Sequence, residues 1–324
     1  MQDKKNPETS RLLTIATRKS NLAMAQAQLV CDLIAPVQAR LVGMSTPGDE
    51  NLVKPLVEIG GKGVFIKTLE QALLSGSADC AVHSLKDMET QFAPDTQIAS
   101  ILPREDPRDA ILGAASLDEL AINAKVGTAS VRRKAQLLKY RPDLDVQLLR
   151  GNINRRIACL ENNEYDAIIL AVAGLKRLNL NIAYSPIDID KMPPAASQGT
   201  LAVQIYERHP DYEFIKQTFS RLNCNNTRSC VTAERATLAD LDGSCRTPIS
   251  AYAYISSSGR LHLQAHIYSP DGAESYSASS SGKPENATEL GQKIAQDLLE
   301  KCGGKLFLSS SVSYTHLRAH ETSR

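Results

Sequence analysis

The stretch Asp79-Cys-Ala-Val-His-Ser-Leu-Lys-Asp87 begins apolar and ends with a serine, a lysine and a carboxylate within four residues. Its apolar part lies between Gly76 and this polar cluster, which predicts a short buried strand. In open α/β sheets, ligands bind beyond the carboxyl ends of the strands. Ser84, Lys86 and Asp87 therefore stand where chemistry usually takes place. A plain loop start would contain the same residues, so the rest of the chain has to decide.

Apolar runs of strand length alternate with segments of helical periodicity along most of the chain. We expect strands at 12–16, 39–44, 80–82, 97–102, 125–127, 146–149, 167–172 and 201–205. We expect helices at 20–33, 64–75, 130–139, 152–162, 211–221 and 228–241. This alternation is typical of parallel sheets with right-handed crossovers. Nearer the C-terminus, strands at 249–255 and 261–268 and a helix at 287–301 predict a small α+β unit.

The composition is that of a globular protein, and its 324 residues suffice for two or three domains. The 37 basic and 36 acidic residues give a net charge of +1, so bulk charge indicates neither a nucleic-acid nor a membrane partner. The N-terminal segment lacks the apolar core of a signal peptide, and the most apolar run, Ala167–Leu175, is too short to span a bilayer. Seven scattered cysteines without metal-ligand spacing favour a reduced, cytoplasmic setting.

Two segments rich in turn-forming residues, Pro103–Pro107 and Met192–Gly199, predict linkers between domains. Residues 45–63 have weak periodicity and end in Gly60-Gly-Lys-Gly63, which predicts a mobile loop over a site with Lys62 at its tip. The spacing of a P-loop is missing, so we do not interpret this loop as a nucleotide site.

Residues 308–324 have no apolar periodicity and follow a predicted helix that has already ended. We interpret them as a non-native tail. His316 and His320 are four residues apart, as metal ligands can be on a helix, but in such a tail we regard the spacing as coincidence. We therefore expect no metal site.

Three basic groups, Arg132-Arg133, Arg150 and Arg155-Arg156, follow predicted strands or begin predicted helices. Helix N-termini favour anions, and the planar guanidinium binds a carboxylate through two parallel hydrogen bonds. Three such junctions in one sheet predict a cleft for a multiply charged anion. The alternative is a solvated helix face whose arginines pair with nearby acidic residues, namely Asp143, Asp145 and Glu161.

Cys245 lies in the turn-rich stretch Leu241-Asp-Gly-Ser-Cys-Arg-Thr-Pro248, beside Arg246. An exposed thiol next to a cation is the setting of a reactive thiolate. No general base can be identified nearby, so taken alone the cysteine could equally be a small residue in a turn.

A colinear series of motifs between Leu12 and Leu306 resembles the porphobilinogen deaminase (hydroxymethylbilane synthase) family. The motifs are Ile15-Ala-Thr-Arg-Lys-Ser20, Gly60-Gly-Lys-Gly63, Ala81-Val-His-Ser-Leu-Lys-Asp87, Arg104-Glu-Asp-Pro-Arg-Asp109, Gly127-Thr-Ala-Ser-Val-Arg-Arg133, Leu149-Arg-Gly-Asn152, Tyr165-Asp-Ala-Ile-Ile-Leu-Ala-Val-Ala-Gly-Leu-Lys-Arg177, Thr232-Ala-Glu-Arg235 and Gly243-Ser-Cys245.

The resemblance implies a transferase of tetrapyrrole (heme and porphyrin) biosynthesis that condenses four porphobilinogen units head to tail and releases ammonia each time. It implies a dipyrromethane cofactor, assembled from porphobilinogen and bound through a thioether to Cys245. Asp87 matches the catalytic carboxylate. Positions that hold the cofactor are matched by Ser84, Lys86, Asp87, Thr128, Ser130, Arg132, Arg133, Arg150 and Arg156. Positions that bind substrate are matched by Arg18, Ser20, Gln26 and Arg177.

The resemblance also implies two doubly wound α/β domains of the periplasmic-binding-protein type and a small C-terminal α+β domain. Domain 1 is expected at 11–102 with 200–222, domain 2 at 106–196 and domain 3 at 226–307, the last carrying Cys245. We expect a monomer that acts on a small-molecule substrate, without a nucleic-acid or membrane partner.

Five positions depart from the pattern expected of the family. Ser197 and Thr200 stand where glycine and alanine are usual, Ala129 where serine is common, Arg155 where threonine is usual, and Glu58 where some relatives have a basic residue. They bear on affinity and loop behaviour more than on the type of reaction. Two other classes of protein remain as alternatives. One is a two-lobed α/β binding protein that captures a polycarboxylate anion without turnover. The other is an RNA-binding protein, which the scarcity of aromatic residues and the neutral net charge disfavour.

Overall fold

The computed structural model describes residues 11–46, 66–241, 247–304 and 307. The chain divides into two compact units, one of residues 1–105 and 200–225 and one of residues 106–199 and 226–324. It passes from the first unit to the second after Glu105 and returns at Thr200, at the two predicted linkers. The α/β class with a small C-terminal α+β part is confirmed, whereas the limits of the three predicted domains stay a prediction.

The first unit contains a five-stranded sheet in the order β2-β1-β3-β10-β4. Its strands are β1 (Leu12–Arg18), β2 (Gln38–Met44), β3 (Cys80–Ser84), β4 (Thr96–Ile101) and β10 (Leu201–Tyr206). Side chains of α1 (Asn21–Leu33) and α7 (Tyr212–Ser220) pack on one face, and those of α3 (Lys67–Leu74) pack on the other. Because both faces are covered, β3 is apolar along most of its length and becomes polar only where it leaves the sheet.

The second unit contains a five-stranded sheet in the order β7-β6-β8-β5-β9. Its strands are β5 (Asp109–Leu112), β6 (Lys125–Thr128), β7 (Asp145–Leu148), β8 (Ala167–Ala171) and the short β9 (Ser185–Pro186). One face packs against α4 (Val131–Tyr140), and the other packs against α5 (Ile153–Glu161) and α6 (Val172–Arg177). Ser130 and Asn152 cap the N-termini of α4 and α5 by accepting backbone N–H bonds.

The expectation of parallel sheets holds only in part, because each of the two α/β sheets also contains antiparallel pairs. β1 runs parallel to β2 and β3, and β6 runs parallel to β7 and β8, but β10 and β5 run against their neighbours. The reason is where the chain enters. Leu201 lies opposite Ser84 at the end of β3, and Asp109 lies opposite Ala171 at the end of β8. A strand that starts beside its neighbour's end must run back along it.

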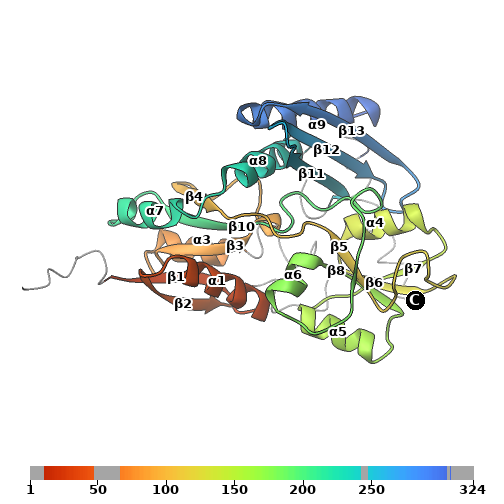
Figure 1. The fold of residues 1–324 in the computed structure, drawn as a ribbon, viewed down its shortest axis with the longest axis horizontal. Coiled ribbons are helices and arrows are strands. Elements are labelled where there is room, and N and C mark those ends of the chain that lie inside the picture. The colour runs from red at the N-terminus through yellow and green to blue at the C-terminus, as the bar shows by residue number, and fades with distance from the viewer. Residues whose placement is uncertain (1–10, 47–65, 242–246, 305–306, 308–324) are drawn as a thin grey trace, which may run out of the picture. The chain divides into compact units, whose positions relative to one another are not determined.

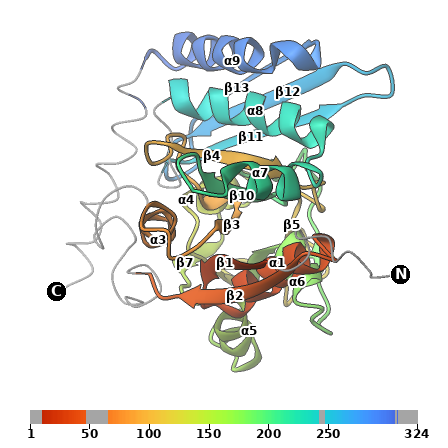
Figure 2. The ribbon, with the colours of Figure 1, turned by 90° about the vertical axis from the view of Figure 1, so that its left-hand side faces the viewer.

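The remaining part of the second unit is a sheet of β11 (Ile249–Ile255), β12 (Leu261–Tyr268) and β13 (Ser275–Gly282). Its apolar face is covered by α8 (Asn225–Asp240) and α9 (Ala287–Lys301), which follows the one-turn helix η3 (Pro284–Asn286) (Figures 1 and 2). Sequence reasoning missed β13 because its serine-rich sequence lacks the apolar alternation of β11 and β12. No helix in the described ranges has the length and apolarity needed to cross a membrane.

The linker before Thr200 is held by buried polar contacts within the second unit. The backbone N–H of Ser197 donates to Oε2 of Glu234 at 2.6 Å, and Oε1 of Glu234 accepts from the N–H of Ala253 at 2.7 Å. The side-chain amide of Gln198 donates to the Pro107 carbonyl at 2.7 Å. Ser197 itself has φ of 63°, in the left-handed region, and its buried hydroxyl lacks a partner among the described residues.

This conformation explains why glycine is the residue expected at position 197. We predict that Ser197→Gly stabilises the protein by roughly 1 kcal/mol. The substitution removes two costs, namely the about 1–2 kcal/mol that a non-glycine residue pays for the left-handed conformation and the cost of an unpaired buried hydroxyl. The greater conformational entropy of glycine in the unfolded chain offsets part of this gain. The free energy of unfolding is measured with denaturant for Ser197→Gly and for Ser197→Ala. Because the alanine variant loses only the hydroxyl, the comparison separates the effect of the hydroxyl from that of the backbone conformation. A glycine variant less stable than the wild type contradicts the explanation.

Candidate functional site: a polar pocket and a buried arginine pair

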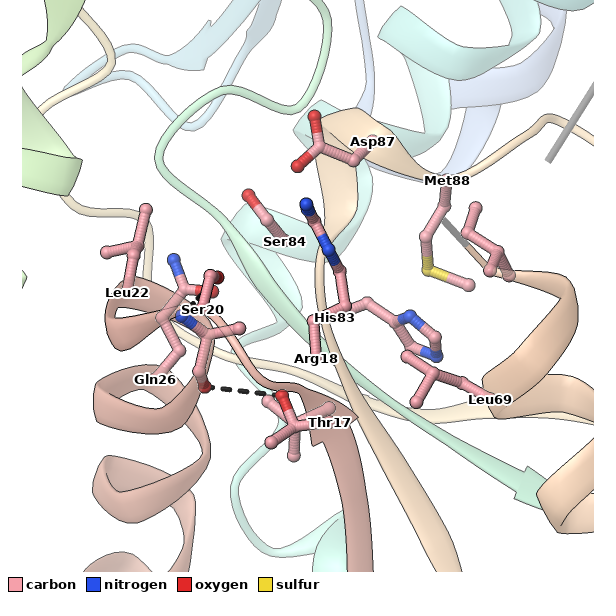
Figure 3. A pocket seen from close by; sticks show the side chains of 13 residues that line it. Thr17, Arg18, Ser20, Leu22, Gln26, Leu69, His83, Ser84, Asp87 and Met88 are labelled. Carbon is pink, nitrogen blue, oxygen red and sulfur yellow. Dashed lines mark hydrogen bonds between the residues drawn. The ribbon is translucent and has the colours of Figure 1, made fainter. Parts of the chain in front are cut away.

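A pocket lies in the first unit at the carboxyl ends of the neighbouring parallel strands β1 and β3 (Figure 3). β1 contributes Thr17 and Arg18, and β3 contributes His83 and Ser84. Asp87 follows on η2 (Leu85–Asp87), a single turn of 3-10 helix. Ser84 and Asp87, at the polar end of the opening stretch, thus line this pocket, while their roles stay a prediction. Lys86 is half-buried and does not line the pocket.

The start of α1 forms the opposite wall of the pocket. Ser20 caps this helix, because its Oγ accepts the N–H of Ala23 at 3.3 Å, and Thr17 Oγ1 donates to the Ala23 carbonyl at 3.2 Å. Arg18, Ser84 and Asp87 gather at one end of the pocket (Figure 3). Among the described residues that line it, Asp87 is the only acidic one, and its side chain is exposed.

Gln26 stands one and a half turns into α1 and also lines the pocket. The residue is only 4% exposed. A side-chain amide has donors and an acceptor, so one that lines a pocket is suited to a ligand with hydrogen-bonding groups.

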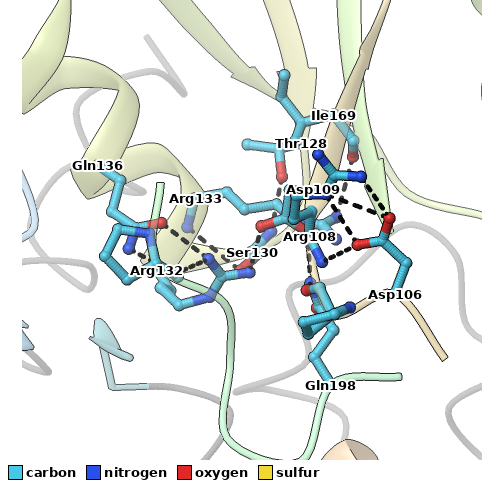
Figure 4. Close-up of polar contacts among 12 residues, drawn as sticks. Asp106, Arg108, Asp109, Thr128, Ser130, Arg132, Arg133, Gln136, Ile169 and Gln198 are labelled. Carbon is cyan, nitrogen blue, oxygen red and sulfur yellow. Dashed lines mark hydrogen bonds and ion pairs between the residues drawn. The ribbon is translucent and has the colours of Figure 1, made fainter. Parts of the chain in front are cut away.

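The arginines of α4 lie in the second unit, and the structure gives them an internal partner that sequence reasoning missed (Figure 4). Arg132 donates through Nη2 to Oδ2 of Asp109 at 2.8 Å, and Arg133 donates through Nη2 to Oδ1 at 2.7 Å. The residues are 4%, 6% and 0% exposed, in the order Arg132, Arg133 and Asp109. Burial raises the pKa of the Asp109 carboxyl, but the charges of the two arginines and their hydrogen bonds outweigh it, so the pKa lies well below its usual range.

This geometry excludes a solvated helix face as the explanation of the arginine pair. Arg132 and Arg133 are buried, and they do not pair with Asp143, Asp145 or Glu161; Asp143 pairs with Arg141 instead. Most of their donors contact protein groups, and their role in holding the cofactor stays a prediction. A usable signal was present. Asp109 directly precedes the apolar run Ala110–Leu112, and a carboxylate at the start of a buried strand requires a cation.

Arg150 has the character of an anion receptor. It follows β7 and precedes the helix α5 that Asn152 caps, and its Nη1 is buried without a hydrogen-bond partner in the described ranges. Burial lowers the pKa of its guanidinium below the usual value. Arg156, on the first turn of α5, is half-buried and donates Nε to the Gly151 carbonyl at 2.9 Å. An orphaned buried guanidinium nitrogen fits a ligand that brings carboxylates, as a dipyrromethane does.

The other predicted residues vary in what they contact. Thr128 is buried at the end of β6, where its Oγ1 accepts the N–H of Ser130 at 3.2 Å. Arg177 donates Nη2 to the Gly199 carbonyl at 2.6 Å, at the linker. Several predictions lie outside the described residues, namely those for Lys62 and its loop, Glu58, Cys245 and residues 308–324. Within the described ranges, no group of His, Cys, Asp and Glu side chains could hold a metal ion.

His83 makes the stability of the first unit depend on pH. Burial lowers its pKa from 6.5 to about 4, against a smaller opposing effect of the neighbouring Gln204 amide. Between pH 6.5 and pH 4 the unfolded chain therefore binds a proton at His83 that the folded chain does not. The free energy of unfolding is thus unaffected by this histidine above pH 6.5 and decreases as the pH falls toward 4. The loss amounts to roughly 3 kcal/mol at pH 4.

We predict that His83→Gln flattens the acid limb of stability measured by denaturant unfolding between pH 7 and pH 4. His262→Gln, on the C-terminal sheet, makes the same chemical change outside the first unit and is measured beside it as the control. An unchanged slope in His83→Gln contradicts a buried, neutral imidazole.

Two family models cover most of the chain. The model described as "Porphobilinogen deaminase, dipyromethane cofactor binding domain" matches residues 13–213, and that described as "Porphobilinogen deaminase, C-terminal domain" matches 228–300. A porphobilinogen deaminase of Nitrobacter hamburgensis is 43% identical over 93% of this chain and 96% of that protein. One of Xanthomonas euvesicatoria is 44% identical over 91% and 98%. A solved methionine binding protein, MetQ, aligns with only 11% identity, over 66% of this chain and 90% of that chain, at a TM-score of 0.41. By its two matching parts and its relatives, the chain belongs to the porphobilinogen deaminase family.

Proposed function

We propose that this chain is a transferase that condenses four porphobilinogen units head to tail to hydroxymethylbilane and releases ammonia at each step. The observation that carries the proposal is the lining of the pocket in the first unit. One carboxylate, Asp87, shares that pocket with Arg18 and with the neutral polar side chains of Ser20, Gln26 and Ser84. No observation favours the two-lobed binding protein without turnover over this reaction.

The pocket suits both ends of the substrate. Porphobilinogen carries an acetate and a propionate, for which Arg18 supplies a fixed positive charge and Ser20 and Gln26 supply hydrogen bonds. Loss of ammonia leaves a cation delocalised onto the pyrrole nitrogen. We propose that Asp87 stabilises this cation and accepts the pyrrole N–H, an electrostatic role that grows as substrate displaces water. It can also donate a proton to the leaving amine and take up the proton lost after coupling.

The second unit is proposed to hold the dipyrromethane cofactor, which supplies the nucleophilic pyrrole on which the chain grows. Arg150, with its unpartnered buried nitrogen, and Arg156 at the N-terminus of α5 bind its carboxylates. Thr128 and Ser130, between β6 and α4, contribute hydroxyl groups, and Arg132 and Arg133 contribute positive charge. Cys245 is the proposed point of thioether attachment.

We further propose that the protein works in the cytoplasm as a monomer and without a nucleic-acid partner. The near-zero net charge and the scattered cysteines support this setting.

We predict that Asp87→Asn lowers the steady-state rate at saturating porphobilinogen by more than roughly tenfold, because the amide carries no charge to stabilise the cation. Asp95→Asn is the matched control. It makes the same chemical change eight residues later, where the carboxylate pairs with the exposed Arg208. Near-normal turnover by Asp87→Asn rules out the catalytic assignment.

We predict that the wild type and Cys302→Ser, but not Cys245→Ser, gain the mass of a covalent dipyrromethane when the apoprotein is incubated with porphobilinogen. Cys302 is a half-buried free thiol at the end of α9, so it controls for the loss of any thiol. Intact-mass spectrometry makes the measurement. A folded wild type that gains neither the adduct nor further stepwise mass fails as a deaminase and leaves the binding-protein alternative.

A further inference from the structure

Helix α4 carries the arginine pair in its first turn and contacts the C-terminal sheet through its later turns. Gly272, in the turn between β12 and β13, has φ of +73° and approaches the helix so closely that an added Cβ would lie 2.4 Å from the Ala135 carbonyl. Lys139 Nζ donates to Ser275 Oγ at 2.5 Å and lies 5.7 Å from the centre of the Tyr268 ring. The hairpin of β12 and β13 therefore packs against α4 between Ala135 and Lys139.

Gln136 connects the hairpin to the arginine pair (Figure 4). Its Oε1 accepts from Arg132 Nη1 at 2.8 Å, and its Nε2 donates to the Pro193 carbonyl at 2.9 Å and to the Tyr268 hydroxyl at 3.2 Å. Gln136 and Tyr268 are each 3% exposed. One buried amide thus joins the C-terminal sheet, the linker that begins at Met192 and the guanidinium of Arg132.

The buried cluster around Gln136 carries a net positive charge. Arg132 and Arg133 contribute two positive charges and Asp109 one negative charge, so the sum is +1. Gln136 and Gln198, which also donate to or accept from this cluster, are neutral. An uncompensated buried charge is costly unless a counter-charge joins it.

Arg132 retains the means to meet such a counter-charge. A guanidinium has five N–H donors. Three hydrogen bonds, to Gln136, the Pro193 carbonyl and Asp109, use three of them. Two donors are therefore left without a partner among the described residues.

We propose that Gln136, held by Tyr268 of the C-terminal sheet, is a positioning residue that aims Arg132 and keeps the arginine pair one positive charge in excess. The excess charge attracts a carboxylate of the bound dipyrromethane. The amide is required because it accepts from the guanidinium without cancelling the charge. This inference rests on the proposed function, in which the second unit holds the cofactor.

Gln136→Glu tests the inference, because it keeps an acceptor for Arg132 but brings the net charge of the cluster to zero. It also loses the Nε2 bond to the Pro193 carbonyl, which the new ion pair with Arg132 offsets. We therefore expect near-wild-type thermal unfolding together with roughly tenfold slower formation of the covalent adduct from porphobilinogen in the apoprotein, a factor equivalent to about 1.4 kcal/mol. A purely structural role would leave the adduct rate unchanged wherever stability is unchanged. Tyr268→Phe keeps the charge but loosens Gln136, and we expect a smaller reduction. Tyr276→Phe removes an exposed hydroxyl of the same hairpin and is the control.

A second readout does not depend on turnover. Citrate, a small tricarboxylate, is added during thermal unfolding of each apoprotein. We expect a rise in the unfolding temperature of the wild type and of Tyr276→Phe, and a smaller rise for Gln136→Glu. Equal rises in the wild type and Gln136→Glu, or equal adduct rates in the two, overturn the inference. If citrate raises the unfolding temperature of the wild type but porphobilinogen forms no adduct with it, the proposed function is contradicted. The difference in the citrate response between the wild type and Gln136→Glu then decides the inference.

Discussion

The buried carboxylate of Asp109 is the interaction on which the second unit depends. It stands at the first residue of β5, is fully buried, and accepts hydrogen bonds from Arg132, Arg133 and Gln198. Removing one partner from such a cluster strands a charge in a low-dielectric interior, which costs about 3–5 kcal/mol. The start of β5, the N-terminal turn of α4 and the linker are therefore held to one arrangement by a single side chain.

Residues 197–200 of the linker are held at both ends by hydrogen bonds. Ser197 bonds to Glu234 of α8, and Gln198 bonds to Pro107 and Asp109. Thr200, where the first unit resumes, accepts the N–H of Leu85 at 2.9 Å, two residues before Asp87. Its hydroxyl accepts from Arg104 at 3.3 Å, so the residue that departs from the family's expected alanine has gained a partner. This segment is thus bonded at Gln198 to the carboxylate that pairs with the arginines and at Thr200 to the turn that carries Asp87.

Charge has opposite local roles in the two parts of the proposed site. In the pocket of the first unit, Asp87 is the single acidic group among the described lining residues, which suits a cationic intermediate. In the cluster of the second unit, two arginines exceed one carboxylate, which suits a polycarboxylate ligand. The net charge of +1 reveals neither, because it sums 37 basic and 36 acidic residues wherever they lie.

Sequence alone determined the features that arise within about fifteen residues. Among them are the buried strand that ends in Ser84, the caps at Ser20 and Ser130 and the basic groups at strand–helix junctions. Only the tertiary structure decided the direction of β5 and β10, the ion pairs of Asp109, more than twenty residues from its arginines, and the left-handed backbone of Ser197. These depend on which strand ends adjoin in space. Periodicity reports which face of an element is buried, but it does not report what that face meets.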